Sequence, residues 1–145
     1  MKAISMILLA IFLGKSCSNE AQNDMTNTTI QYVANTRGFF QKIIITNKKA
    51  IISRDRNAVE TPQEMTISDA DWKELVSDFQ KINLDELATL KDPTQKRFYD
   101  GAAIANLKIH YQNKDYETVA FDHGFPPVEI EKLVNKIVSF AKEKE

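Results

Sequence analysis

The sequence predicts an α+β domain in which an antiparallel sheet of about four strands carries two helices packed on one face. Two observations lead to this class. Segments with alternating apolar and polar residues, typical of half-buried strands, precede two segments whose apolar residues are spaced three and four apart, as in amphipathic helices. The order ββα–ββα therefore repeats. Strands joined by short turns pair antiparallel and leave one face for the helices.

The first half of the domain is predicted mainly from strand patterns. In order, it is expected to contain a strand at 28–35, a strand at 39–46, a turn at 47–49, a short returning strand at 50–54 and a loop at 55–66. Ile30, Tyr32 and Ala34 fall on one side of the first strand. Three consecutive isoleucines at 43–45 make the second strand strongly β-prone. Pro62 and its polar neighbours account for the predicted loop.

A helix is predicted to begin at Ser68. The Ser68 hydroxyl can accept a hydrogen bond from a first-turn N–H, and Asp69 and Asp71 suit the positive end of the helix dipole. The apolar residues that follow form one continuous stripe: Trp72, Leu75, Val76, Phe79 and Ile82. We therefore expect Trp72 to lie in the core. A turn-like, leucine-containing segment follows at 84–90.

The second half repeats the strand and helix patterns. It is expected to contain a strand at 103–111, a hairpin loop at 112–115, a returning strand at 116–121 and a final helix. Pro126 and Pro127 open this helix, where the missing N–H groups have no intrahelical partner in any case. Its predicted buried stripe consists of Ile130, Leu133, Val134, Ile137 and Ala141.

Composition bounds the class of protein. A chain of 145 residues with 43% hydrophobic and 27% charged residues suits one globular domain. The net charge is −1, and removal of Lys2 and Lys15 with a cleaved leader makes it −3. This weakly acidic balance argues against a nucleic-acid partner, because phosphate binding requires a concentrated basic face. A single cysteine leaves no internal disulfide.

The N-terminus is typical of a bacterial lipoprotein signal. Lys2 supplies the positive charge, and residues 3–13 are apolar apart from Ser5. This run is too short to span a bilayer but suits a signal peptide. Small residues precede Cys17, where the thiol takes a diacylglyceryl thioether and cleavage frees the amine for acylation. The motif departs from the usual lipobox at Gly14, where an aliphatic residue is usual.

The predicted organisation follows from this motif. Residues 1–16 are a lipoprotein signal peptide, residues 17–27 form a flexible tether that begins with the lipidated Cys17, and residues 28–145 form a single α+β domain. An ordinary secretory signal followed by a free cysteine is the alternative. No Asp follows Cys17, which favours the outer over the inner membrane of the cell envelope.

Two loop segments combine arginine with aromatic side chains, which are enriched at recognition surfaces. They supply six candidate binding residues: Arg37, Phe39, Lys96, Arg97, Phe98 and Tyr99. Each segment lies just before a strand, and an antiparallel sheet can bring both to one edge. The alternative is that Phe98 and Tyr99 fold onto the sheet edge. We expect Arg97→Ala or Tyr99→Ala to leave folding largely intact and to weaken partner binding.

Asp122 and His123 lie side by side in the loop before the final helix. An adjacent Asp and His suggest acid–base chemistry, and an envelope enzyme using this pair is one hypothesis. Catalysis also needs a nucleophile or a polarising partner, and the sequence contains no GxSxG or HExxH motif and no nucleophilic cysteine. A capping or solvated turn that contributes to binding is the preferred interpretation. Two isolated histidines also give no metal site, and no cofactor is predicted.

The order of motifs resembles two groups of proteins. The residues that carry the resemblance are Arg37-Gly38-Phe39, Asp100-Gly101 and the segment 121–137. Over residues 29–141 the chain resembles small uncharacterised lipoproteins of Gram-negative bacteria. More remotely, it resembles the emfourin-type (protealysin) inhibitors of thermolysin-like metalloproteases. Those inhibitors often have paired glycines before the aromatic residue, whereas Arg37 holds the first of these places here.

These observations predict a non-catalytic binding module held on a membrane by its N-terminal lipid. Its partner is expected to be an envelope protein, and inhibition of a thermolysin-like metalloprotease is the alternative that the resemblance implies. An enzyme is the third and least favoured hypothesis.

Overall fold

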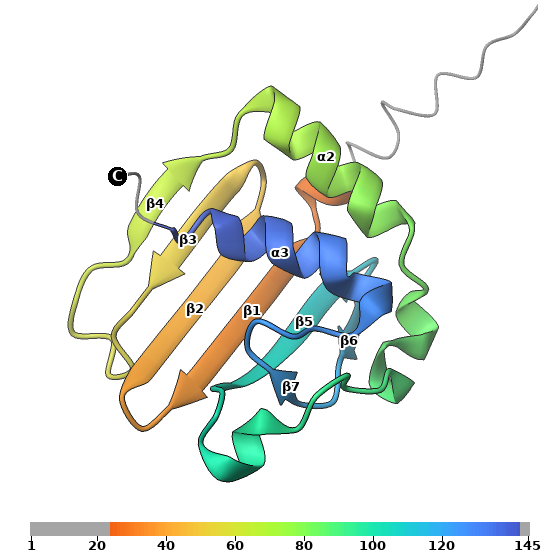
Figure 1. Ribbon diagram of the computed structural model, residues 1–145. Helices are drawn as coiled ribbons and strands as arrows, with labels where there is room; N and C mark the ends of the chain where they lie inside the picture. The colour runs from red at the N-terminus through yellow and green to blue at the C-terminus, as the bar shows by residue number, and fades with distance from the viewer. Residues whose placement is uncertain (1–23, 143–145) are drawn as a thin grey trace, which may run out of the picture.

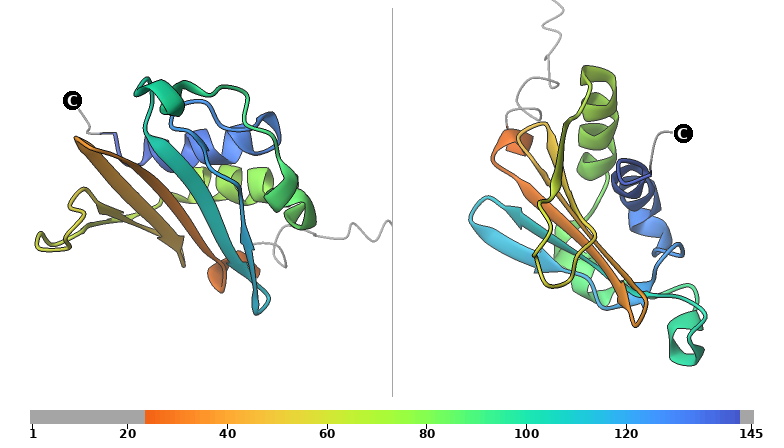
Figure 2. Two further views of the ribbon diagram at one scale, coloured as in Figure 1. Left: turned by 90° about the horizontal axis from the view of Figure 1, so that it is seen from below. Right: turned by 90° about the vertical axis from the view of Figure 1, so that its left-hand side faces the viewer.

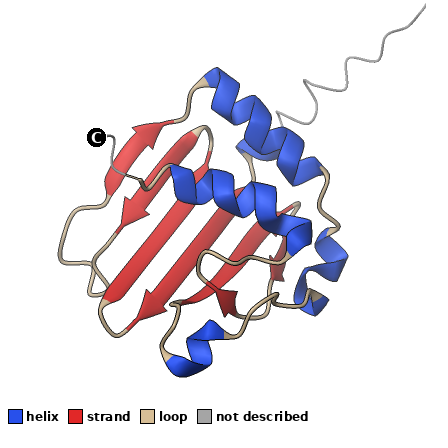
Figure 3. Cartoon of the chain, in the orientation of Figure 1, coloured by secondary structure: helices blue, strands red, loops and turns tan. Residues whose placement is uncertain are grey.

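The computed structural model describes residues 24–142 and shows a seven-stranded antiparallel sheet with helices on one face (Figures 1 and 3). The strands are β1 (Thr29–Thr36), β2 (Phe39–Thr46), β3 (Lys49–Ser53), β4 (Gln63–Thr66), β5 (Ile104–Tyr111), β6 (Lys114–Glu117) and β7 (Phe121–Asp122). The helices are α2 (Asp69–Gln80) and α3 (Glu131–Ser139), with 3₁₀ helices η1 (Leu84–Thr89), η2 (Lys96–Tyr99) and η3 (Val128–Ile130). The predicted α+β class is confirmed.

The strand order is β4-β3-β2-β1-β5-β6, and β7 pairs with the start of β5. The predicted count of about four strands is therefore too low, and the chain does not repeat a simple ββα order. Both α2 and α3 lie on the same face of the sheet (Figure 2).

Two strands escaped the sequence patterns for different reasons. β4 lies inside the predicted loop at 55–66, and only Met65 of its four residues is even partly buried, so no alternation marks it. The predicted strand at 116–121 is divided into β6 and β7 by Thr118. The Thr118 N–H donates to the Leu107 carbonyl, and its hydroxyl accepts from the Leu107 N–H at 3.0 Å. A side-chain oxygen thus takes the place of a backbone acceptor where the strand is interrupted.

Tight hairpin turns set the register of the sheet. Asn47 and Lys48 have φ of 44° and 60°, and Gln112 and Asn113 have φ of 49° and 59°. Positive φ at both central residues is the geometry of a two-residue type I′ turn. The observed hairpin loop therefore has two residues, Gln112 and Asn113, and not the four predicted at 112–115.

The core lies between the helices and one face of the sheet. Ile30, Tyr32 and Ala34 of β1 point into it, as their alternation predicts. Trp72 is buried on α2, and the Ser68 hydroxyl accepts from the Asp71 N–H at the start of this helix. The predicted helix start and the core position of Trp72 are confirmed.

The folded domain begins earlier than predicted. Residues 24–26 form a helical turn, and Met25 is fully buried. The Thr28 hydroxyl donates to the Asp24 carbonyl at 2.8 Å. Residues 24–27 therefore belong to the domain and not to a flexible tether, because one buried methionine creates no periodic pattern in a polar segment. The predicted signal peptide, Cys17 and the rest of the tether lie outside the described residues. Among residues 24–142, no helix is long and apolar enough to cross a membrane.

Candidate interaction surface

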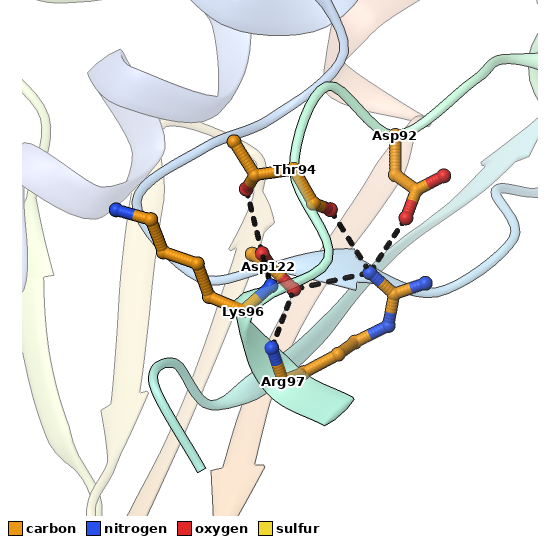
Figure 4. Close-up of polar contacts among 5 residues, drawn as sticks. All are labelled: Asp92, Thr94, Lys96, Arg97 and Asp122. Carbon is orange, nitrogen blue, oxygen red and sulfur yellow. Dashed lines mark hydrogen bonds and ion pairs between the residues drawn. The ribbon is translucent and has the colours of Figure 1, made fainter. Parts of the chain in front are cut away.

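A buried carboxylate holds the loop that contains η2. Asp122 of β7 has no exposed surface and accepts four hydrogen bonds from this loop (Figure 4). Its Oδ2 accepts from the Thr94 hydroxyl and the Lys96 N–H, each at 2.6 Å. Its Oδ1 accepts from the Arg97 N–H at 3.1 Å and from the guanidinium of the same residue at 3.0 Å. Asp122 therefore satisfies the N-terminal N–H groups of η2 from a strand 25 residues away.

The environment keeps this carboxylate ionised. Burial acts to raise the pKa of Asp122, but hydrogen bonds from Thr94, the Arg97 side chain and two backbone N–H groups outweigh it and lower the pKa to about 2. At neutral pH the group is an anion surrounded by donors. No buried side-chain nitrogen or oxygen among the described residues lacks a hydrogen-bond partner.

Arg97 belongs to this internal network. Its guanidinium contacts the Asp92 carboxylate at 2.6 Å as well as Asp122, and its side chain is only 11% exposed. Arg97 and Asp122 are therefore occupied within the fold and unavailable to a partner. These contacts lead us to expect that Arg97→Ala lowers stability, contrary to the expectation from the sequence that it leaves folding largely intact. Arg97 was expected on the surface, because its carboxylate partners lie 5 and 25 residues away along the chain and no local pattern links them to it.

The two aromatic side chains of η2 are exposed to solvent. Phe98 and Tyr99 are each 71% exposed, so neither packs onto the sheet edge. The Arg97 guanidinium carbon lies 4.5 Å from the centre of the Phe98 ring. The loop closes through Gly101, whose N–H donates to the Lys96 carbonyl at 2.8 Å. A side chain at Gly101 would come within 2.8 Å of the Tyr99 ring, so glycine allows the chain to pass close to it.

The turn between β1 and β2 lies at the same end of the sheet as η2, at the bottom of Figure 1. Arg37 of this turn is exposed and lines a groove of about 560 Å³ together with Arg56, Asp100 and Ile104. The two arginine-aromatic segments therefore lie at the same end of the central strands β1, β2 and β5, and not at an edge of the sheet as the sequence suggested. Ile104 is 53% exposed and adds apolar surface between them.

His123 connects the turn to the core. Its ring lies 5.3 Å from the Phe39 ring and 5.9 Å from the Tyr32 ring, measured between centroids. Burial lowers the pKa of His123 and raises the pKa of the Tyr32 hydroxyl. Both groups are therefore neutral at pH 7, and the Tyr32 hydroxyl and Nδ1 of His123 share a hydrogen bond at 2.7 Å. The His123 ring therefore packs against one side of the Phe39 ring, which remains partly exposed.

Asp122 and His123 do not act as a pair. The carboxylate of Asp122 points toward η2, whereas the ring of His123 contacts Tyr32 and Phe39. No contact joins the two side chains, so the acid–base pairing suggested by their adjacency is absent. In residues 24–142, no three histidine, cysteine or acidic side chains are grouped to hold a metal ion.

A second turn contributes a residue that the sequence analysis missed. Gly124 has φ of 89°, and the Phe125 N–H donates to the Asp122 carbonyl at 2.9 Å. This turn places the Phe125 ring 3.9 Å from the Lys96 ammonium. Phe125 remains 39% exposed. Only the glycine, a common turn residue, marks this position in the sequence.

Together these residues form what we term the aromatic end surface. It consists of Arg37, Phe39, Lys96, Phe98, Tyr99, Ile104 and Phe125. Five of the six candidate residues from the two segments belong to it, and only Arg97 does not.

Comparison of the chain with family models, curated proteins and solved structures gives no match.

Proposed function

We propose that the protein is a lipid-anchored, non-catalytic binding module of the cell envelope and that the aromatic end surface contacts its protein partner. The observation that carries this proposal is the exposure of Phe98 and Tyr99 on a loop whose backbone is held by buried hydrogen bonds. The exposure of a large aromatic side chain to water is unfavourable in free energy in the free protein. A loop fixed before binding loses little conformational entropy on association, so its exposed rings favour recognition.

The anchoring half of the proposal predicts the behaviour of Cys17→Ala. Without its only cysteine the chain has no thiol for a diacylglyceryl group. We expect labelling by a fatty-acid analogue to be abolished and the protein to leave the membrane fraction. Cys17→Ser is the matched control for removal of the sulfur with little change in size, and the same loss is expected. Undiminished labelling in either variant would rule out lipidation at this position.

The binding half predicts the behaviour of the double variant Phe98→Ala/Tyr99→Ala. Since both rings are mostly in solvent, their removal is expected to change stability within about 0.5 kcal/mol per substitution. Retention of an envelope partner should nevertheless fall by about tenfold or more, because aromatic side chains carry much of the energy of interfaces. Thermal denaturation and affinity capture from native envelope measure the two quantities. Val59→Ala is the control, because Val59 is exposed but lies outside the aromatic end surface. Capture equal to that of the unmutated domain would place the interface elsewhere.

A further inference from the structure

The aromatic end surface lies at the far end of the sheet from the point where the described chain begins. The Tyr111 hydroxyl, at the end of β5, contacts the Asp24 carboxylate at 3.4 Å. Ile104, at the start of the same strand, belongs to the aromatic end surface. Seven residue steps separate these two positions, which is about 24 Å along an antiparallel strand. Figure 1 shows the two ends, with the first coloured segment of the chain near α2 and η2 at the opposite end of the strands.

This separation is comparable to the reach of the segment that joins the domain to Cys17. Seven steps lie between Cys17 and Asp24, and a fully extended chain covers at most about 25 Å in that number. If Cys17 holds the lipid, the aromatic end surface meets the anchoring bilayer only when this segment runs back along the whole strand at full extension. Such an arrangement has almost no conformational freedom and is entropically costly. The anchor therefore favours a surface that points away from the membrane.

The charges at this end indicate what the surface recognises. Arg37 is exposed, and no acidic side chain among residues 24–142 forms an ion pair with it. Arg56 is held beside it, because its guanidinium donates to the Asn35 side chain at 2.5 Å and to the Thr36 carbonyl at 2.6 Å. Two arginines thus line one groove, and of the described residues that line it Asp100 alone is acidic. Guanidinium groups bind carboxylates through paired, charge-assisted hydrogen bonds.

From this geometry we infer that the aromatic end surface takes a protein segment in which a carboxylate side chain lies next to aromatic or aliphatic side chains. The carboxylate enters the groove between Arg37 and Arg56. The neighbouring apolar side chains cover Phe98 and Tyr99. This inference rests on the proposed function and adds the chemistry of the partner and the direction in which the surface faces.

The test uses the lipid-free chain that starts at Ser18, since the described residues 24–142 enclose one continuous hydrophobic core. A display library of random short peptides is selected on this domain. We expect enrichment of peptides that combine Asp or Glu with an aromatic or aliphatic residue. Their affinity should fall about tenfold or more in Arg37→Gln/Arg56→Gln and in Phe98→Ala/Tyr99→Ala. Lys73→Gln, a neutralised exposed lysine on α2, is the matched control and should bind as the unmutated domain does.

Three outcomes would overturn the inference: no enrichment, enrichment of peptides without carboxylates, or equal affinity in the double arginine variant. A fourth is binding to vesicles of phosphatidylethanolamine and phosphatidylglycerol that depends on Phe98 and Tyr99, because the surface would then recognise lipid. The proposed function is tested separately by partner capture. If capture depends on Phe98 and Tyr99 but the peptides lack acidic residues, only the partner chemistry fails. If capture is unaffected in Phe98→Ala/Tyr99→Ala, the proposed binding surface fails as well.

Discussion

Replacing Arg97 by alanine is expected to lower the free energy of unfolding by about 3–5 kcal/mol, because it leaves the buried Asp122 carboxylate without its charged partner. Asp122 has no exposed surface from which water could compensate. Urea denaturation at neutral pH measures the effect. The matched control is Asp115→Asn, which breaks an exposed pair with His110 and should cost no more than about 1 kcal/mol. A second variant, Arg97→Ala/Asp122→Asn, should recover part of the loss by removing the unpaired charge.

The same ion pair predicts a dependence of stability on pH. The folded state lowers the pKa of Asp122 from 3.8 to about 2. The ionised carboxylate therefore stabilises the fold fully above pH 4, and this stabilisation is lost as the pH falls through 2. We expect Asp122→Asn to flatten the decline in stability between these values.

For Arg97→Ala, a loss of unfolding free energy below about 1 kcal/mol, the range of an exposed pair, would show that the network does not hold η2.

Trp72→Ala is expected to have an effect of similar size for an apolar reason. Trp72 is 2% exposed on the face of α2 that packs against the sheet. Removing a buried aromatic side chain costs about 3–5 kcal/mol through lost transfer energy and the cavity that remains. This is a large part of the total stability of a small domain, about 5–15 kcal/mol.

The control for this substitution is Phe98→Ala, which removes a large aromatic side chain that is 71% exposed. Thermal denaturation should show a strongly lowered melting temperature for Trp72→Ala and an almost unchanged one for Phe98→Ala. Equal shifts in the two variants would contradict the assignment of Trp72 to the core and of Phe98 to the surface.

The central elements of the fold were predictable because each carries a local signal. β1 and β5 alternate between core and solvent, and α2 carries one apolar stripe, so periodicity identified them. Three consecutive isoleucines marked β2 through their high β-propensity. β4 has no such signal, because its outer position leaves one side chain to bury. The division between β6 and β7 depends on a tertiary hydrogen bond from the Leu107 N–H to the Thr118 hydroxyl. No local sequence pattern predicts this bond.

The candidate site shows the same limit. Arginine beside aromatic residues correctly marked the segments that meet at one end of the sheet. The sequence did not separate Arg97, which points inward, from Phe98 and Tyr99, which point outward. That difference depends on a carboxylate 25 residues further along the chain. The adjacency of Asp122 and His123 suggested shared chemistry, but Asp122 ends β7 and His123 lies in the turn that follows, and their side chains contact different parts of the fold.

The proposed contact is tested most directly by photo-cross-linking in cells, with a photoreactive amino acid in place of Tyr99 in the full lipid-anchored chain. Lys73, exposed on α2 and outside the aromatic end surface, is the matched control position. We expect position 99 to give a discrete adduct with one envelope protein, lost in a Phe98→Ala/Arg37→Gln background, and position 73 to give none. Adducts with lipid alone at position 99, or the same adduct at both positions, would contradict a protein-binding role for the aromatic end surface.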